Sequence, residues 1–256
     1  HGCTYCFARP THAFHDLSPG LDFETRLFAK PDAPALLREA LGKRGYVCQP
    51  IAFGTNTDPY QPIEREWRIT RGCIEVLAAC DHPITITTKS DRVTRDIDLL
   101  APMAARGLAA VMISVTSLDP KIAATLEPRA PHPERRLAAV ATLRAAGIPT
   151  YVSLSPVVPQ VTDHEMEHIM ERAAKAGALG CFFLPVRLPH DAMRDLPRSA
   201  DTDQGVHSGY VPGGVFEYAK TFDVPDDWRD KTVRLEFEGG YRDALVLLHG
   251  EAVVDE

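Results

Sequence analysis

The sequence predicts an α/β protein: a partial (β/α) barrel of parallel strands, followed by an incomplete antiparallel β-sandwich segment. Three observations lead to this prediction. Short runs rich in β-branched residues alternate with alanine- and leucine-rich stretches up to about residue 190, glycines close several of the helical stretches, and apolar residues recur with period two thereafter. We expect two domains, residues 1–190 and 191–256.

The barrel part is predicted from a repeated helix–glycine–strand unit. Its expected strands are Pro50 to Gly54, Ile84 to Thr88, Ala110 to Val115, Thr150 to Ser155 and Gly180 to Val186. The expected helices are Ala33 to Leu41, Arg65 to Ala79, Asp96 to Ala105, Pro133 to Ala146 and Asp163 to Ala176. Gly107, Gly147 and Gly177 follow three of these helices, where a left-handed C-cap is favoured. Strands that alternate with helices in this way form parallel sheets and barrels.

The C-terminal part differs in both pattern and charge. Three alternating runs, Val215 to Val224, Lys231 to Glu238 and Ala244 to Gly250, predict antiparallel strands of a sandwich. From Ala200 onward there are 13 acidic and 5 basic residues, a net charge of −8, whereas the preceding part has a net charge of +1. All six cysteines precede residue 182. The two parts therefore read as different proteins.

Composition narrows the class of protein. With 256 residues and 45% hydrophobic residues, the chain can bury a sizeable core. No apolar run approaches the roughly 18 residues of a membrane helix and no signal peptide is visible, so we expect a cytoplasmic enzyme without a membrane partner. The barrel part lacks the basic stripe that phosphate contact requires, so charge does not support nucleic-acid binding, and Arg135-Arg136 is expected on a solvated helix face. Four cysteines are expected to be core thiols: Cys48, Cys73, Cys80 and Cys181.

Cys3 and Cys6 are candidate metal ligands near the start of the chain. Two cysteines with two residues between them suit an iron–sulfur cluster, a zinc site or a redox dithiol, and they also occur by chance. Zinc needs two more ligands, and Cys73 and Cys80 have six residues between them instead of two. A redox dithiol should follow a strand and open a helix, but no strand precedes Cys3 and Pro10 follows closely. Spacing alone leaves a metal role about as favoured as a redox or chance pair.

Polar residues follow the expected strands, where barrel proteins hold their ligands. Taken singly, each is more typical of a helix cap or a turn. Their recurrence at successive strand ends favours a shared site. The residues are Thr55, Asn56, Thr57, Asp58, Lys89, Ser90, Ser114, Thr116, Ser117, Ser153 and Ser155.

Three segments carry a resemblance to a known family: Cys3 to His12, Gly20 to Arg26 and Gly54 to Glu64. Through them the chain resembles radical S-adenosylmethionine proteins, and more narrowly the spore photoproduct lyase-related branch. The resemblance implies a [4Fe–4S] cluster held by three cysteines, spaced three and then two residues apart. S-adenosylmethionine would bind the fourth iron through its amino and carboxylate groups. Cys3 and Cys6 match the second and third of those cysteines.

The first cysteine of that motif would lie four positions before Cys3, outside the given sequence. We expect a fragment of a longer protein that is inactive as given. The alternative is a recruited ligand, such as His1 or His12. A terminal residue fixes little geometry, so His1 is a weak candidate.

The resemblance also implies roles for individual residues. Tyr5 would pack near the adenine of S-adenosylmethionine, and Lys89, Ser90 and Ser114 would hold its carboxylate or ribose. An external electron donor would reduce the cluster, and reductive cleavage would then give a 5′-deoxyadenosyl radical. The site must exclude water to protect that radical. Substrate identity is not implied.

Glu64 and Arg129 match positions that the branch shares, without an implied role. A surface ion pair is the alternative interpretation of both residues.

The C-terminal part resembles the N-terminal sugar-binding domain of glycoside hydrolase family 2, the β-galactosidase family. The matching segments are Gly209 to Gly214, Thr221 to Pro225, Trp228 and Phe237 to Gly239. Val186 to Met193 fits the opening of that family, and Leu188-Pro189-His190 within it also fits the radical family. We therefore expect a composite chain. The alternative function is a non-catalytic carbohydrate-hydrolase accessory segment without glycosidase activity. Stacking on sugar is one interpretation of Trp228 and Tyr241, and core packing is the favoured one.

Overall fold

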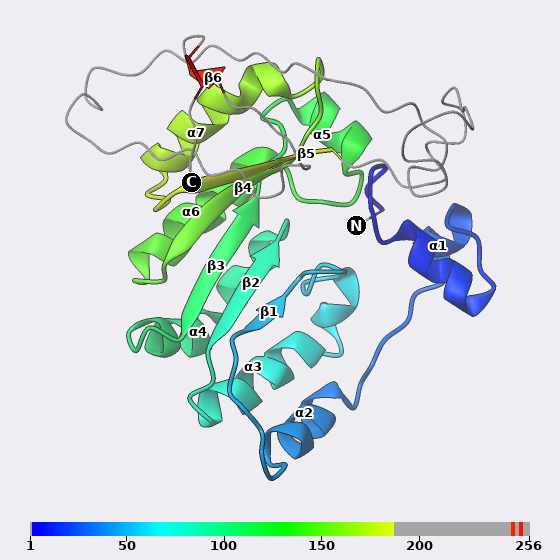
Figure 1. The fold of residues 1–256 in the computed structure, drawn as a ribbon, viewed down its shortest axis with the longest axis vertical. Coiled ribbons are helices and arrows are strands. Elements are labelled where there is room, and N and C mark those ends of the chain that lie inside the picture. The colour runs from blue at the N-terminus through cyan, green and yellow to red at the C-terminus, as the bar shows by residue number, and fades with distance from the viewer. Residues whose placement is uncertain (1, 187–246, 249–250, 253–256) are drawn as a thin grey trace. The chain divides into compact units, whose positions relative to one another are not determined.

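The structure is a computed structural model that describes residues 2–186, 247–248 and 251–252. The chain divides into two units, His1–Glu217 and Tyr218–Glu256. The first unit contains a five-stranded parallel sheet with helices packed along it (Figure 1). The second contains a two-stranded antiparallel sheet, β6 (Leu247–Leu248) and β7 (Glu251–Ala252), and β6 lies within the expected strand Ala244 to Gly250. The other two expected sandwich strands, and Trp228 and Tyr241, lie outside the described residues.

The sheet of the first unit confirms the predicted parallel strands. Its strands are β1 (Ile51–Phe53), β2 (Ile84–Thr88), β3 (Ala109–Ser114), β4 (Thr150–Val157) and β5 (Cys181–Pro185). They pair in chain order, and every pair is parallel. This order, with a helix between successive strands, is the arrangement of a partial (β/α) barrel.

The connecting helices match the predicted ones closely. They are α2 (Ala33–Leu41), α3 (Ile69–Ala79), α4 (Ile97–Ala104), α6 (Pro133–Ala145) and α7 (Met166–Lys175). Gly107, Gly147 and Gly177 have φ of 73°, 77° and 87°, which confirms the predicted left-handed positions after three helices.

The short elements were not predicted as separate elements, because each is too brief to show a periodic pattern, and the turn at Asp163–Glu165 falls within the expected helix Asp163 to Ala176. They are α1 (Leu21–Thr25), α5 (Pro120–Leu126) and the 3₁₀ turns η1 (Arg9–His15), η2 (Pro62–Arg65), η3 (Asp91–Asp96) and η4 (Asp163–Glu165). The expected start of α3 at Arg65 was wrong. Arg68 adopts a left-handed backbone with φ of 48°, which interrupts the helix and moves its start to Ile69.

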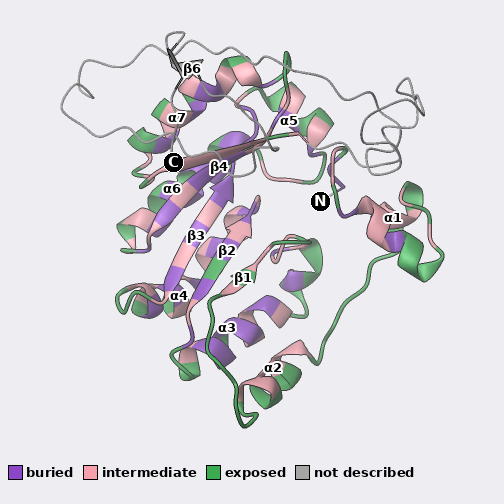
Figure 2. Cartoon of the chain, in the orientation of Figure 1, coloured by how far each residue is buried: buried purple, intermediate pink, exposed green. Residues whose placement is uncertain are grey.

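One face of the sheet forms the hydrophobic core. Alternate strand residues such as Ile86, Ile113 and Val152 are fully buried against helix residues such as Leu77 and Leu143. Figure 2 shows this alternation of buried and partly exposed residues along most of β3, whereas the middle of β4 is buried on consecutive residues. The opposite face, which would line a barrel, is less covered.

The cysteine expectation was half wrong. Cys73 is buried and Cys181 is half-buried, but Cys48 and Cys80 are exposed. Cys80 follows α3 as its C-cap and Cys48 precedes β1, and both thiols are exposed instead of facing the core. All six thiols are free. Among the described residues, no helix has the length and apolar character needed to cross a bilayer.

Candidate functional site

Cys3 and Cys6 lie on one tight loop. The amide of Cys6 donates to the carbonyl of Cys3 at 3.2 Å, and the amide of Arg9 donates to the carbonyl of Cys6 at 3.2 Å. The Arg9 guanidinium closes the loop by donating to the Cys3 carbonyl from Nε at 3.1 Å and from Nη2 at 3.0 Å. Cys3 is buried and Cys6 is half-buried. The backbone therefore holds both thiols in a fixed turn, as ligands of one metal centre would require.

The cysteine loop is attached to the segment that follows α5. The Thr4 amide donates to the carbonyl of Leu126 at 3.0 Å, and the Tyr5 hydroxyl donates to Oε1 of Glu127. This segment comes after the carboxyl end of β3. The loop is therefore anchored at the edge of the sheet where parallel barrels bind their ligands.

Glu127 is the buried centre of this attachment. Its side chain has no exposed surface, and Oε1 also accepts a 2.7 Å hydrogen bond from Thr116. Oε2 lies 2.6 Å from Nη1 of Arg136, whose side chain is 1% exposed. This is a charge contact, because Oε2 has no hydrogen bond of good geometry among the described residues. Arg136 in turn donates to the carbonyls of Pro131 at 2.7 Å and Ser114 at 3.1 Å.

The charges of this cluster are set by burial and by matched partners. Burial acts to raise the pKa of Glu127, but Arg136, Lys89 and the hydrogen bonds from Tyr5 and Thr116 outweigh it and lower that pKa. Burial, followed by the charge of Glu127, raises the pKa of Tyr5 far above its usual range. Tyr5 therefore stays protonated and donates to an ionised carboxylate. Burial also raises the pKa of the Cys3 thiol.

Lys89 points toward this cluster because of strand alternation. It follows β2, whose residues Ile84 and Ile86 face the helices, so Lys89 has the opposite orientation. Its Nζ lies 5.9 Å from the centre of the Tyr5 ring. Within the described part of the chain, the Lys89 ammonium forms no ion pair. It is a half-buried cation beside the cysteine loop that an anionic ligand can neutralise.

Asp58 fixes the backbone at Lys89. Its carboxylate accepts from the Lys89 amide at 2.8 Å, from the Thr88 hydroxyl at 2.8 and 2.9 Å, and from the Tyr60 amide at 2.9 Å. Gly54 allows the turn that delivers Asp58. It has φ of 90°, and a Cβ there would lie 2.0 Å from the carbonyl oxygen of Thr87. This part of the predicted site is a structural clamp.

The two predicted serines occupy different settings. Ser90 is 2% exposed and its Oγ accepts from the Arg92 amide at 3.3 Å, so it caps η3, as the alternative interpretation expected. Ser114 is 3% exposed, and strand alternation places its side chain on the same face of the sheet as that of Lys89. The carbonyl of Ser114 accepts a hydrogen bond from Arg136. The structure thus brings Tyr5, Lys89 and Ser114 to one cluster and uses Ser90 as a cap. Their contacts with a ligand remain predictions.

Sequence reasoning missed Glu127 and placed Arg136 wrongly. Arg136 was expected on a solvated face, yet it is buried because Glu127 and two carbonyls match its charge and donors. Helical spacing carried a signal, since Arg136 lies four residues before Val140 and seven before Leu143, both fully buried.

Glu64 and Arg129 had no assigned role, and their settings differ. Arg129 forms a partly exposed pair with Glu24, as the surface alternative expected. Glu64 is 3% exposed and bonds Arg95 and the Thr70 amide instead, so a surface ion pair was the wrong interpretation there.

The donor set for a metal is limited to the two thiols. Across residues 2–186, no group of three His, Cys, Asp or Glu side chains is arranged to hold a metal ion. Nε2 of His12 lies 2.9 Å from the carbonyl oxygen of Arg26 and the ring contacts Phe23 and Phe28, so His12 is a buried residue whose Nε2 already has a partner. Two thiols on one loop fit part of the ligand set of an iron–sulfur cluster.

Comparison with known proteins identifies the family. The sequence profile of the radical SAM superfamily matches residues 1–173. This chain therefore belongs to the radical S-adenosylmethionine superfamily.

Individual relatives are similar over part of their length. An uncharacterized protein of Mycobacterium tuberculosis (strain ATCC 25618 / H37Rv) is 39% identical over 182 residues, covering 70% of this chain and 54% of that protein. The chain thus spans about half the length of the curated relatives it matches. The structure of a spore photoproduct lyase mutant with bound AdoMet and dinucleoside spore photoproduct aligns with a TM-score of 0.55 at 18% identity, covering 75% of this chain and 55% of that one. At that identity the similarity concerns the fold.

A different relative matches a smaller part of the chain. The β-galactosidase BoGH2A of Bacteroides ovatus (strain ATCC 8483) is 34% identical over 79 residues, which is 31% of this chain and 9% of that enzyme. This is a partial similarity to the glycoside hydrolase family that the C-terminal segments resemble.

Proposed function

We propose that this chain is part of a radical S-adenosylmethionine enzyme in which Cys3 and Cys6 bind two irons of a [4Fe–4S] cluster. The observation that carries the proposal is the cysteine loop, which is tied to buried Glu127 and lies beside Lys89, whose ammonium forms no ion pair with any described residue. When bound, the cluster supplies one electron from an external donor for reductive cleavage of S-adenosyl-L-methionine to a 5′-deoxyadenosyl radical.

The residues around the loop have separate tasks. Lys89 provides the cation for the carboxylate of S-adenosylmethionine, since it lacks an ion pair within the described residues and lies beside Tyr5. The ring of Tyr5 packs near the adenine, and Ser114 approaches the ribose from the same face of the sheet. Ser90 contributes by fixing the turn after Lys89. Glu127 and Arg136 are positioning residues that hold the loop.

Iron incorporation tests the cluster. The chain is reconstituted anaerobically with iron and sulfide, and iron content and visible absorption are measured for Cys3→Ala and Cys6→Ala. The matched controls are Cys48→Ala and Cys80→Ala, which remove exposed thiols that no described contact links to the loop. We expect the first two variants to lose the brown chromophore and the controls to keep it. Equal iron binding by all four would contradict the proposal.

The match to β-galactosidase supports a second candidate function for the C-terminal segment. We propose that residues 191–256 are a carbohydrate-hydrolase accessory segment, joined to the barrel part without a catalytic role. The test is hydrolysis of a chromogenic β-galactoside together with limited proteolysis. No hydrolysis and a cut between about residues 195 and 209 that leaves the barrel part folded would support it. Hydrolysis, or cooperative loss of both parts, would contradict it.

A further inference from the structure

A second charged feature lies outside the cysteine site, in a surface pocket of about 500 Å³. Elements η2, η3 and α6 and the residue before α3 supply five arginines to its wall, together with one carboxylate. These residues are Arg65, Arg68, Arg92, Arg95, Arg135 and Asp91. The volume falls in the range of small-molecule sites.

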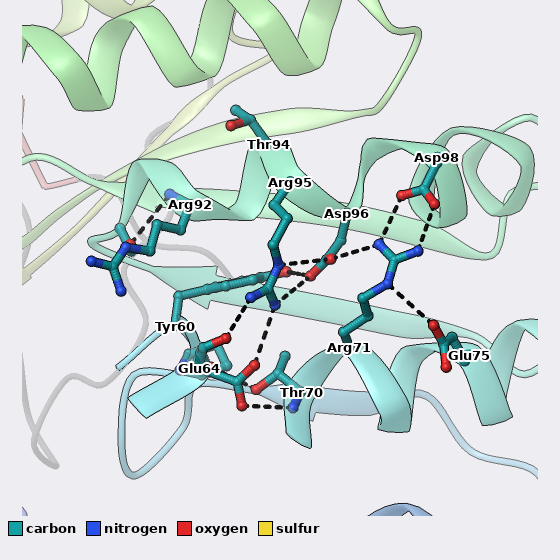
Figure 3. A network of polar contacts seen from close by, with 12 residues as sticks. Tyr60, Glu64, Thr70, Arg71, Glu75, Arg92, Thr94, Arg95, Asp96 and Asp98 are labelled. Carbon is teal, nitrogen blue, oxygen red and sulfur yellow. Dashed lines mark hydrogen bonds and ion pairs between the residues drawn. The ribbon is translucent and has the colours of Figure 1, made fainter. Parts of the chain in front are cut away.

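Two of the five guanidinium charges are matched. Arg95 bonds buried Asp96 at 3.1 and 3.2 Å and Glu64 at 3.2 Å, and Figure 3 shows it between the two carboxylates. Arg135 pairs with Asp91 at 2.5 Å. The acidic partners of Arg95 and Arg135 are therefore already used in ion pairs.

The other three guanidiniums are unmatched. Within the described residues Arg65 and Arg68 form no ion pair, and Nη1 of Arg92 is buried without a hydrogen-bond partner. Figure 3 shows the Arg92 guanidinium apart from the carboxylates that hold Arg95. Burial, and next the charge of Arg65, lowers the pKa of Arg92; Arg95 and Arg135 act in the same direction, and only Asp91 opposes them. The pocket is therefore a concentration of positive charge.

An unpartnered buried donor is costly, and converging like charges add to that cost. Planar guanidiniums bind the oxygens of phosphate through paired hydrogen bonds. A bound phosphate would both accept a hydrogen bond from Nη1 of Arg92 and offset the repulsion among the arginine charges. We propose that this arginine pocket is a binding site for a phosphate group, as a free phosphate ester or as a phosphodiester. The site does not depend on the cluster, since it shares no residue with the cysteine loop or the Glu127 cluster.

Titration with inorganic phosphate tests the proposal. Binding is measured by calorimetry and by thermal unfolding, with chloride replaced so that ionic strength stays constant. The variants are Arg92→Gln and Arg68→Gly, and glycine suits the left-handed φ of 48° at that position. Arg38→Gln removes one exposed positive charge from α2 and serves as the net-charge control.

We expect phosphate to raise the melting temperature more than chloride does. Arg92→Gln and Arg68→Gly should each weaken phosphate binding at least about tenfold, and Arg38→Gln less than about twofold. A short single-stranded oligonucleotide distinguishes the sources. Competition with phosphate supports a phosphodiester ligand, and binding of phosphate alone supports a free ester. Equal effects of phosphate and chloride, or equal affinity in all variants, would overturn the proposal.

Discussion

The Glu127 cluster and the arginine pocket both lie at the carboxyl ends of the parallel strands, and they treat charge in opposite ways. Around Glu127, one buried carboxylate meets one buried guanidinium and two hydroxyl donors. Around Arg92, three guanidiniums line one pocket, and none of them forms an ion pair with a carboxylate in the part of the chain that the structure describes. The first arrangement is matched in charge among the described residues, although Oε2 of Glu127 lacks a hydrogen bond there, whereas the second needs an anion to match its charge.

This difference separates structural charge from binding charge. A matched buried pair stabilises only while both partners remain, since loss of one leaves an uncompensated ion. An unmatched surface cluster costs stability until a ligand arrives. Lys89 also forms no ion pair with a described residue, although it lies beside the Glu127 cluster. We therefore count its charge as a binding charge.

The largest expected effect is the loss of Glu127. Glu127→Ala leaves Arg136 buried without a countercharge and frees Tyr5 from its acceptor, so we expect a loss of about 3–5 kcal/mol in unfolding free energy. Urea denaturation measures it. Adding Arg136→Met should recover part of the loss. A single-variant loss below about 1 kcal/mol would mean that the pair is not structural.

The second largest loss of unfolding free energy is expected at Gly54. This glycine allows the turn that brings Asp58 to the Lys89 amide. Gly54→Ala places a methyl group against the Thr87 carbonyl at a positive φ, and we expect a loss of about 2–4 kcal/mol. Gly107→Ala is the control, because its φ is also positive but no described atom lies within 4 Å of the added Cβ. Equal losses in thermal unfolding would refute the steric explanation.

Asp96→Asn removes one of the two carboxylates that match Arg95, which lines the pocket. Asp96 accepts from Tyr60, Arg71 and Arg95 without exposed surface, so we expect a loss of about 2 kcal/mol. The freed Arg95 charge should also tighten phosphate binding. Urea denaturation and calorimetry check the two effects. Weaker phosphate binding in a folded variant would count against the charge argument.

The smallest stability change is expected at Arg92. Arg92→Gln removes an unmatched charge, so unfolding free energy without phosphate should stay within about 0.5 kcal/mol or increase. Thermal unfolding in chloride measures this. A loss above about 2 kcal/mol would identify Arg92 as a structural residue and make the two clusters alike.

The strands and helices of the barrel part could be predicted well from the sequence, because apolar runs and glycines indicate secondary structure over a few neighbouring residues. The five strands follow from short apolar runs, which are rich in β-branched residues in β2 and β4, and Gly107, Gly147 and Gly177 mark helix ends by their own backbone preference. Lys89 and Ser114 were expected from their places at strand ends, and Cys3, Cys6 and Tyr5 from the cysteine motif and the family resemblance. The pairing of Glu127 with Tyr5 joins residues 122 positions apart, which no periodic pattern reveals.

The arginine pocket was missed for a similar reason. Arg65 and Arg92 lie on either side of β2 in the sequence, and their convergence depends on how η2, η3 and α6 pack. Exposed Cys48 and Cys80 show the reverse error, because an apolar neighbourhood in sequence does not fix which side a thiol faces.

The most direct test of the radical S-adenosylmethionine proposal is electron paramagnetic resonance of the reduced, reconstituted protein, with and without S-adenosylmethionine. It is measured on this chain and on one extended to place a cysteine four positions before Cys3. We predict a [4Fe–4S]⁺ signal in the extended chain that changes when S-adenosylmethionine is added and is lost in Cys3→Ala. No cluster signal in either chain would contradict the account.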